Sequence, residues 1–309
     1  MAREFWSRVS AVRLDALVVG LLAAISTAAS LGANLRATPH PLLVGIIVFL
    51  LARMAIWADR PSTLTRWLPV ACLCLVYAQL DTGAGVTSVV MRLFRTTPAD
   101  GLMLAADRAL FGQTPALWFD TDRLASPGAM AFWHVWYLLG YFPVAVAALA
   151  VVHLKGHEEA FYQVRARMVW LYLVGYLLYG LVPVTGPFRF EPLAAAFVHP
   201  DAGLAFLGAA RKATAAYDCF PSLHAAGSGF FVWAMWPYLS RWWRGAALAN
   251  ATLVILATLA SRVHYGVDLV AGLAYLVALL QVAGWVEHRN ERHTLRLLGL
   301  SPRRPSAPA

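Results

Sequence analysis

The chain has 309 residues, of which 60% are hydrophobic and 13% charged, and its mean hydropathy is +0.61. A soluble domain carries roughly 25% charged residues, so this composition excludes an ordinary water-soluble domain, a disordered chain and a disulfide-rich secreted module. The formal net charge is +9. Because most of the basic residues flank apolar runs instead of forming a stripe, we expect a membrane as partner and no nucleic acid.

Eight apolar runs follow one another along the chain. They cover residues 16–33, 41–57, 67–91, 129–152, 168–184, 224–239, 246–260 and 265–286. A helix needs about 20 mainly apolar residues to cross a bilayer, so the second, sixth and seventh runs are short. The pattern predicts an all-α, polytopic membrane bundle with about eight transmembrane helices. For the first run a cleavable signal peptide is the alternative, and we expect an uncleaved helix.

The placement of Lys and Arg predicts the orientation of the bundle. If the N-terminus is cytoplasmic and every run crosses the membrane, the cytoplasmic segments hold most of the basic residues, which favours both termini inside. Residues 186–189, 220–224 and 262–268 then lie together on the outer, non-cytoplasmic face. The long segments 94–127 and 187–221 lie there too, and residues 102–111 could form a short amphipathic helix at the interface.

Two polar residues at the start of the last apolar run share one helix face. His264 and Asp268 are four residues apart, which places their side chains one turn from each other. A carboxylate in that position can accept from one imidazole nitrogen and leave the other free as a nucleophile or base. The alternative, a purely structural hydrogen bond, has about the same weight for this pair taken alone.

A second histidine stands at the start of the sixth run. His224 follows Ser222, which can cap the helix, and a helix N-terminus offers N–H groups that favour an anion. Arg189 and Arg262 fall on the same predicted face. Two helix starts, each with a histidine, together with two arginines predict a phosphate site.

These residues resemble the signatures of a known family. Residues 221–224 read Pro-Ser-Leu-His and residues 264–268 read His-Tyr-Gly-Val-Asp, which resemble the second and third signatures of the type 2 phosphatidic acid phosphatase superfamily. The sequence is most similar to its inositol phosphorylceramide synthase-like branch, whose second signature likewise reads Phe-Pro-Ser-Leu-His. Weaker matches lie upstream, at 107–112, at His134, Tyr137 and 141–142, and between 182 and 189.

The resemblance also has departures. The superfamily's first signature has Lys and Arg before a proline, and only Arg189 corresponds here. An arginine usually stands six residues before the third-signature histidine, where this chain has Thr258. Arg262 lies only two residues before that histidine and is the candidate to replace it. With Leu223 in place of the common glycine, these changes favour the transferase-like branch over a plain phosphatase.

The resemblance implies a phosphotransfer in two steps that needs no metal and no other cofactor. His264 would attack phosphorus and form a phosphohistidine, Asp268 would orient His264, and His224 would exchange protons with the leaving and accepting oxygens. Arg189, Ser222 and Arg262 would hold the phosphoryl oxygens. His134 and Tyr137 could line the headgroup pocket, although core packing is at least as plausible a role for them.

The resemblance covers roughly residues 100–280 and implies a six-helix core. We therefore expect N-terminal transmembrane helices in 1–95, partly outside the core, the phosphatase-like or phosphotransferase-like core in 96–288, and a basic cytoplasmic tail in 289–309. The expected activity is transfer of a phospho-headgroup, such as inositol phosphate, from a phospholipid to a lipid hydroxyl of the sphingolipid type. A lipid phosphate phosphatase is the runner-up. A transporter or flippase, or a haem or quinone protein, is the alternative outside this class.

Overall fold

A computed structural model describes residues 86–156, 158–200 and 216–297; for residues 86, 159 and 286–297 it describes the backbone alone. From the third apolar run it also describes six helical residues, Trp67, Val70, Leu73, Cys74, Val76 and Tyr77. The predicted runs 16–33 and 41–57, and the part of the expected tail beyond residue 297, lie outside the described residues. The division into N-terminal helices, core and tail stays a prediction.

The described part of the chain is helical throughout and contains no strand. Its α-helices are α4 (Val86–Phe94), α5 (Asp100–Phe111), α6 (Pro127–Leu139), α7 (Phe142–Lys155), α8 (Glu158–Leu181), α9 (Glu191–Ala194), α11 (Leu223–Met235), α12 (Arg241–Ala260) and α13 (Gly266–Leu297). Two short 3-10 turns, η1 (Pro115–Phe119) and η2 (Trp236–Tyr238), join them. The all-α prediction is confirmed for these residues.

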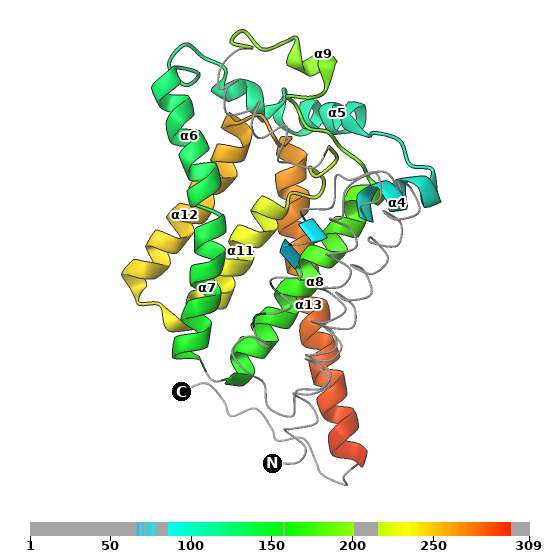
Figure 1. Ribbon diagram of the computed structural model, residues 1–309, viewed down its shortest axis with the longest axis vertical. Coiled ribbons are helices and arrows are strands. Elements are labelled where there is room, and N and C mark those ends of the chain that lie inside the picture. Colours follow the sequence, from blue (N-terminus) through cyan, green and yellow to red (C-terminus); the bar gives the residue numbers. More distant parts are fainter. Residues whose placement is uncertain are drawn as a thin grey trace, which may run out of the picture.

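Helix α11 lies at the centre of the bundle, in contact with α7, α8, α12 and α13. The long helices run along the molecule in Figure 1, whereas α5 lies across one end of it, against the start of α13. Small residues and buried phenylalanines line α11, among them Ala226, Phe230 and Phe231. Because α11 is enclosed by other helices, its first turn is held in a fixed position relative to its neighbours.

The predicted helix 129–152 is divided into α6 and α7. Pro143 stands in the first turn of α7, so it has no N–H to give to the carbonyl of Leu139 four residues earlier, and it disfavours helical backbone in the residue before it. The carbonyl of Gly140 at the break accepts a hydrogen bond of 2.9 Å from Asn250 Nδ2 of α12. Asn250 therefore satisfies one of the groups that the interruption releases.

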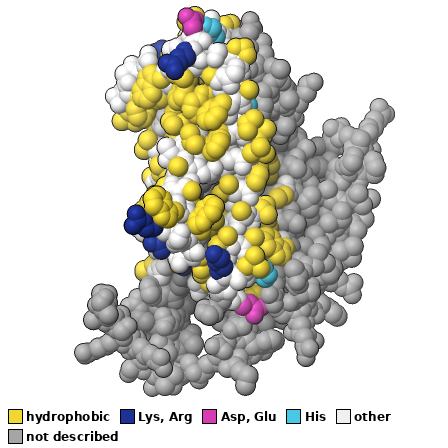
Figure 2. Space-filling model, turned by 90° about the vertical axis from the view of Figure 1, so that its left-hand side faces the viewer, with side chains coloured by type: hydrophobic (Ala, Val, Ile, Leu, Met, Phe, Trp, Pro, Cys, Tyr) yellow, Lys and Arg dark blue, Asp and Glu magenta, His cyan; other side chains and the backbone are white. Residues whose placement is uncertain are grey.

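Three stretches of the described chain are long and apolar enough to cross a membrane: Pro127–Lys155, Arg241–Ala260 and Gly266–Trp285. Large apolar side chains are exposed along α6 and α7, for example Phe132 and Val146. Figure 2 shows the face on this side of the molecule, where hydrophobic side chains extend between charged side chains near both ends. This distribution supports association with a membrane, while the total of eight crossings and the six-helix core stay predictions.

Candidate active site

The starts of α11 and α13 are joined at one end of the bundle. The main-chain N–H of Ser222 donates to the main-chain oxygen of Asp268 over 3.0 Å. Gly272, one turn further along α13, makes this approach possible, because a Cβ there would lie 2.3 Å from the Ser222 carbonyl oxygen. Ser222 also caps α11, since its Oγ accepts from the N–H of Ala225 over 3.2 Å, as the sequence predicted.

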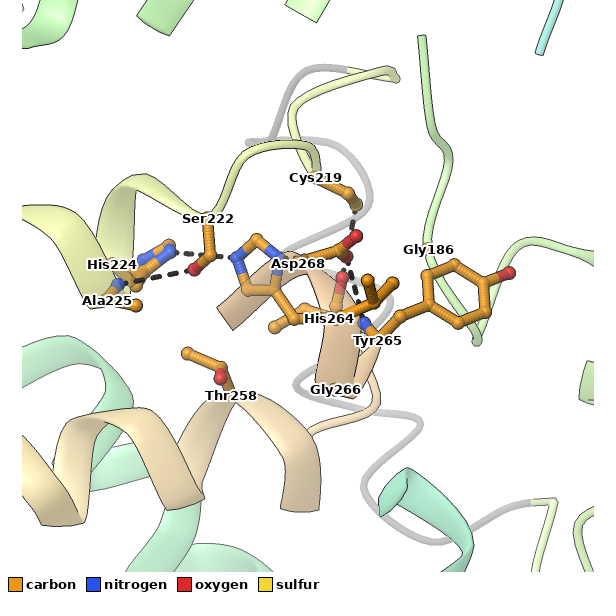
Figure 3. A network of polar contacts seen from close by, with 12 residues as sticks. Gly186, Cys219, Ser222, His224, Ala225, Thr258, His264, Tyr265, Gly266 and Asp268 are labelled. Atoms are coloured by element: carbon orange, nitrogen blue, oxygen red, sulfur yellow. Dashed lines mark hydrogen bonds and ion pairs between the residues drawn. The ribbon is translucent and has the colours of Figure 1, made fainter. Parts of the chain in front are cut away.

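The two predicted histidines face each other across this junction. His224 Nδ1 lies 3.2 Å from His264 Nε2, and the ring planes meet edge to face (Figure 3). His264 belongs to the short connection between α12 and α13, and His224 to the first turn of α11. The structure thus brings together two residues that are 40 positions apart in the sequence.

Asp268 lies on the other side of His264. Its Oδ2 atom is 3.5 Å from His264 Nδ1 and accepts a shorter hydrogen bond of 2.9 Å from the N–H of Tyr265. At 3.5 Å the pair is close enough for an ionic interaction but long for a hydrogen bond. Burial lowers the pKa of His264 to about 3, and the main-chain carbonyl of Cys219 opposes part of that shift. His264 is therefore neutral at physiological pH, with Asp268 beside Nδ1 and Nε2 directed to His224.

Two tyrosines pack against the ring of His224. The centroids of the Tyr137 and Tyr141 rings each lie 4.7 Å from the centroid of His224. The Tyr141 hydroxyl donates to the carbonyl of Leu223 over 2.9 Å and contacts the Tyr172 hydroxyl. The structure thus places Tyr137 against the site, and His134, one turn earlier in α6, is buried as well. Whether either contacts a lipid headgroup stays a prediction.

Arg189 lies in the segment that packs on the connection between α12 and α13. Its guanidinium carbon is 5.1 Å from the centre of the Phe188 ring, and the N–H of Phe188 donates to the carbonyl of Arg262 over 3.1 Å. Burial raises the pKa of the Cys219 thiol, and the positive charge of Arg189 opposes part of that shift. Arg189 is therefore close enough to act electrostatically on the loop that leads into α11.

Arg262 is held by the segments around Asp120 and His199, and its role in phosphate binding stays a prediction. Its Nη2 lies 2.9 Å from Asp120 Oδ1 and donates to the carbonyl of His199 over 2.9 Å. The guanidinium stacks 4.1 Å above the Phe197 ring. The guanidinium of Arg262 is thus engaged by Asp120, His199 and Phe197. Thr258, at the position where the superfamily usually has arginine, is fully buried and donates to the carbonyl of Ile255 over 2.7 Å.

Two buried carboxylates of α5 contribute to the site without having been predicted to do so. Asp100 accepts hydrogen bonds from the N–H groups of Thr185 and Gly186 and from the Tyr265 hydroxyl. Asp107 accepts from the first residues of α13, and its pKa is raised by burial, which these hydrogen bonds partly oppose. The signal in the sequence was their spacing of seven residues, which puts both on one helix face once the helix predicted at 102–111 is extended back to Asp100, where α5 begins.

The described part of the chain contains no group of three His, Cys, Asp or Glu side chains arranged to hold a metal ion. The chemistry available from the site's own residues is nucleophilic attack by a neutral imidazole, with a second imidazole within reach for proton transfer. That the reaction needs no metal stays a prediction.

The fold and this site define a helical membrane-type protein with a His/His/Asp cluster at one end of its bundle, in which His264 and Asp268 are buried. A family model described as the PAP2 superfamily matches residues 102–282, and the chain belongs to that superfamily. Its members are phosphatases, and membership indicates phosphatase or phosphotransferase activity on lipid-like substrates. The comparisons with curated proteins and with solved structures gave no match. The match confirms the superfamily, and the inositol phosphorylceramide synthase-like branch stays a prediction.

Proposed function

We propose that the protein is an integral-membrane lipid phosphotransferase that moves a phospho-headgroup from a phospholipid to a lipid hydroxyl through a phosphohistidine. The observation that carries the proposal is the contact between His264 Nε2 and His224 Nδ1 with Asp268 behind His264. His264 would be the nucleophile, with the proton-transfer group His224 on one side and the orienting carboxylate Asp268 on the other. A double displacement on phosphorus needs these three roles.

The first displacement begins with attack of His264 Nε2 on the phosphorus of the donor. As the new P–N bond forms, the P–O bond to the diacylglycerol breaks, and the leaving oxygen takes a proton from His224, which carries protons on both ring nitrogens in the complex with the anionic phosphate and becomes neutral. Asp268 stabilises the positive charge that develops on the imidazole of His264. In the second displacement the acceptor hydroxyl gives its proton to His224, its oxygen attacks phosphorus, and the P–N bond breaks.

The phosphoryl oxygens need cationic or N–H partners during both displacements. We assign that role to Arg189 and to the N-terminal end of α11 with Ser222. Asp120 already neutralises Arg262, so we assign Arg262 a smaller part in binding phosphate than the sequence predicted.

The burial of His264 and Asp268, behind a half-buried His224, supports a lipid acceptor over water. The His264 side chain is 2% exposed and the Asp268 side chain 0%. A site that excludes bulk water limits hydrolysis of a reactive intermediate, so an acceptor that arrives through the bilayer has the advantage. Phosphatase activity is the second candidate, because members of the superfamily are phosphatases.

The experiment uses purified protein in vesicles that contain headgroup-labelled phosphatidylinositol with or without ceramide. We expect a labelled lipid product that depends on ceramide, is unaffected by EDTA and is absent with His264→Ala. Release of water-soluble inositol phosphate would instead support hydrolysis of this donor. Liberation of inorganic phosphate from phosphatidic acid as the sole activity would support the phosphatase and contradict the transferase. The reaction centre is proposed to lie on the non-cytoplasmic face, with both termini in the cytoplasm.

A further inference from the structure

The first turn of α13 is capped from another helix. Helix α13 begins at Gly266 and is preceded by Tyr265, whose side chain is not one of the short polar groups that cap helices. Asp107 of α5 caps the helix instead. Its Oδ2 accepts from the N–H of Gly266 over 3.1 Å and its Oδ1 from the N–H of Val267 over 2.8 Å. Asp107 is fully buried. Both carboxylate oxygens are thus used on two successive N–H groups of the turn that carries Asp268.

This capping depends on close contact between α5 and α13. A Cβ at Gly266 would lie 2.6 Å from Pro115 Cγ and 2.7 Å from Phe111 Cε2. Only glycine therefore lets the end of α5 and the start of η1 come near enough for Asp107 to reach the main chain of α13. Contacts among α5, η1 and the start of α13 therefore fix the position of Asp107.

The consequence concerns Asp268, which lies in the same turn. Its Oδ2 accepts from Tyr265 and is 3.5 Å from His264 Nδ1. If the N–H groups of Gly266 and Val267 lacked an acceptor, a buried carboxylate beside them would be drawn toward these donors. A substrate phosphate would be attracted to the same helix end, away from the two histidines.

We propose that Asp107 is a positioning residue, which occupies the N-terminus of α13 so that Asp268 stays on His264 and the substrate phosphate stays between the histidines. The inference rests on the proposed function for its effect on turnover, whereas the capping itself does not. Asp107 touches neither histidine in the described hydrogen bonds, so its influence passes through the first turn of α13.

The test is Asp107→Asn, which keeps the shape of the side chain but presents an amide NH2 to one of the two N–H groups. We expect kcat to fall by about 100-fold, as for other displacements of a catalytic group by about 1 Å, with little change in KM. In a double-mutant cycle with Asp268→Asn the losses should be strongly non-additive, because both act on His264. Asp122→Asn, at a fully exposed side chain, is the control for loss of one negative charge.

Amide hydrogen exchange provides a measurement that does not depend on the substrate. In Asp107→Asn, the peptide covering residues 264–270 should exchange at least about tenfold faster than in the wild type, while peptides of α12 remain unchanged. Unchanged exchange in that peptide, or strictly additive losses in the cycle, would overturn the proposal. If the wild-type protein turns over no phospholipid, the proposed function fails, and the exchange result still decides whether Asp107 holds this turn.

Discussion

His224 Nδ1 and His264 Nε2 lie 3.2 Å apart, a hydrogen-bonding distance between a half-buried imidazole and a buried one. One ring must donate and the other accept. If His264 keeps its proton on Nδ1, beside Asp268, then Nε2 carries the lone pair and His224 is the donor. No phosphoryl group fits within 3.2 Å, so the substrate must displace this contact. In the proposed mechanism the anionic phosphate then favours the imidazolium form of His224, whose Nδ1 proton turns from His264 to the oxygen that leaves.

A first prediction is that the three residues of the cluster act as one unit. His264→Ala, His224→Ala and Asp268→Asn should each lower kcat by at least about 1,000-fold, and a double variant should lose little more than His264→Ala alone. Steady-state kinetics and thermal unfolding of the same preparations check this. Independent, multiplicative losses would mean that the residues do not share one step.

A second prediction concerns the pH profile. Because burial lowers the pKa of His264 from 6.5 to about 3, the neutral, nucleophilic form persists as the pH falls and is lost only near pH 3. The acid limb of kcat/KM, which reports the free enzyme, should therefore be absent between pH 5 and pH 7. Circular dichroism at each pH controls for unfolding. An acid limb centred near 6.5, with a circular dichroism spectrum unchanged over that range, would contradict an imidazole held neutral by burial.

A third prediction distinguishes the two arginines. Arg262 adopts a left-handed φ of 58° at the end of α12, where glycine is usual, and its guanidinium is held by Asp120. Arg262→Ala and Asp120→Ala should each reduce thermal stability, with a coupling of about 1–3 kcal/mol, and change KM little. Arg189→Ala should instead lower kcat/KM by at least about tenfold. A large KM effect of Arg262→Ala that is independent of Asp120 would contradict this division and support the predicted role of Arg262 in phosphate binding.

A fourth prediction tests the orientation in the membrane. Cys219 is a poor reporter, because its thiol is buried and donates to the Val263 carbonyl. In a variant without native cysteines, Asp122→Cys places an exposed thiol at the active-site end, and Ser240→Cys places one before α12 at the opposite end. An impermeant maleimide applied to intact cells or spheroplasts should label position 122 alone. Labelling of position 240 alone would invert the topology.

Several features of the fold and site were accessible to sequence analysis because they depend on local pattern. The start of α11 at Leu223 and of α13 at Gly266 each differ by one residue from the predicted runs. The spacing of His264 and Asp268 placed both on one helix face, and the structure places Asp268 beside His264. The break between α6 and α7 was also encoded locally, by Pro143, but the apolar pattern continues through it.

Other features depend on partners that have no signature in the sequence. Asp107 bonds main-chain N–H groups 159 and 160 residues away, and every residue except proline has such a group. Asp120 reaches Arg262 across 142 residues, a contact that the position of Arg262 two residues before His264 does not reveal. The partners of charged residues such as Asp107 and Arg262 are set by tertiary packing, which the sequence pattern does not show.

The most direct test of the central claim is to trap the covalent intermediate. Protein mixed with phosphorus-32-labelled phosphatidylinositol, without an acceptor, and quenched in base within one turnover should carry label that is stable in base and labile in acid. Mass spectrometry should place the modification on His264, and His264→Gln should abolish it while Asp122→Asn retains it. A labelled Ser222, Cys219 or His224, or single-turnover product formation with no labelled protein, would contradict the phosphohistidine mechanism.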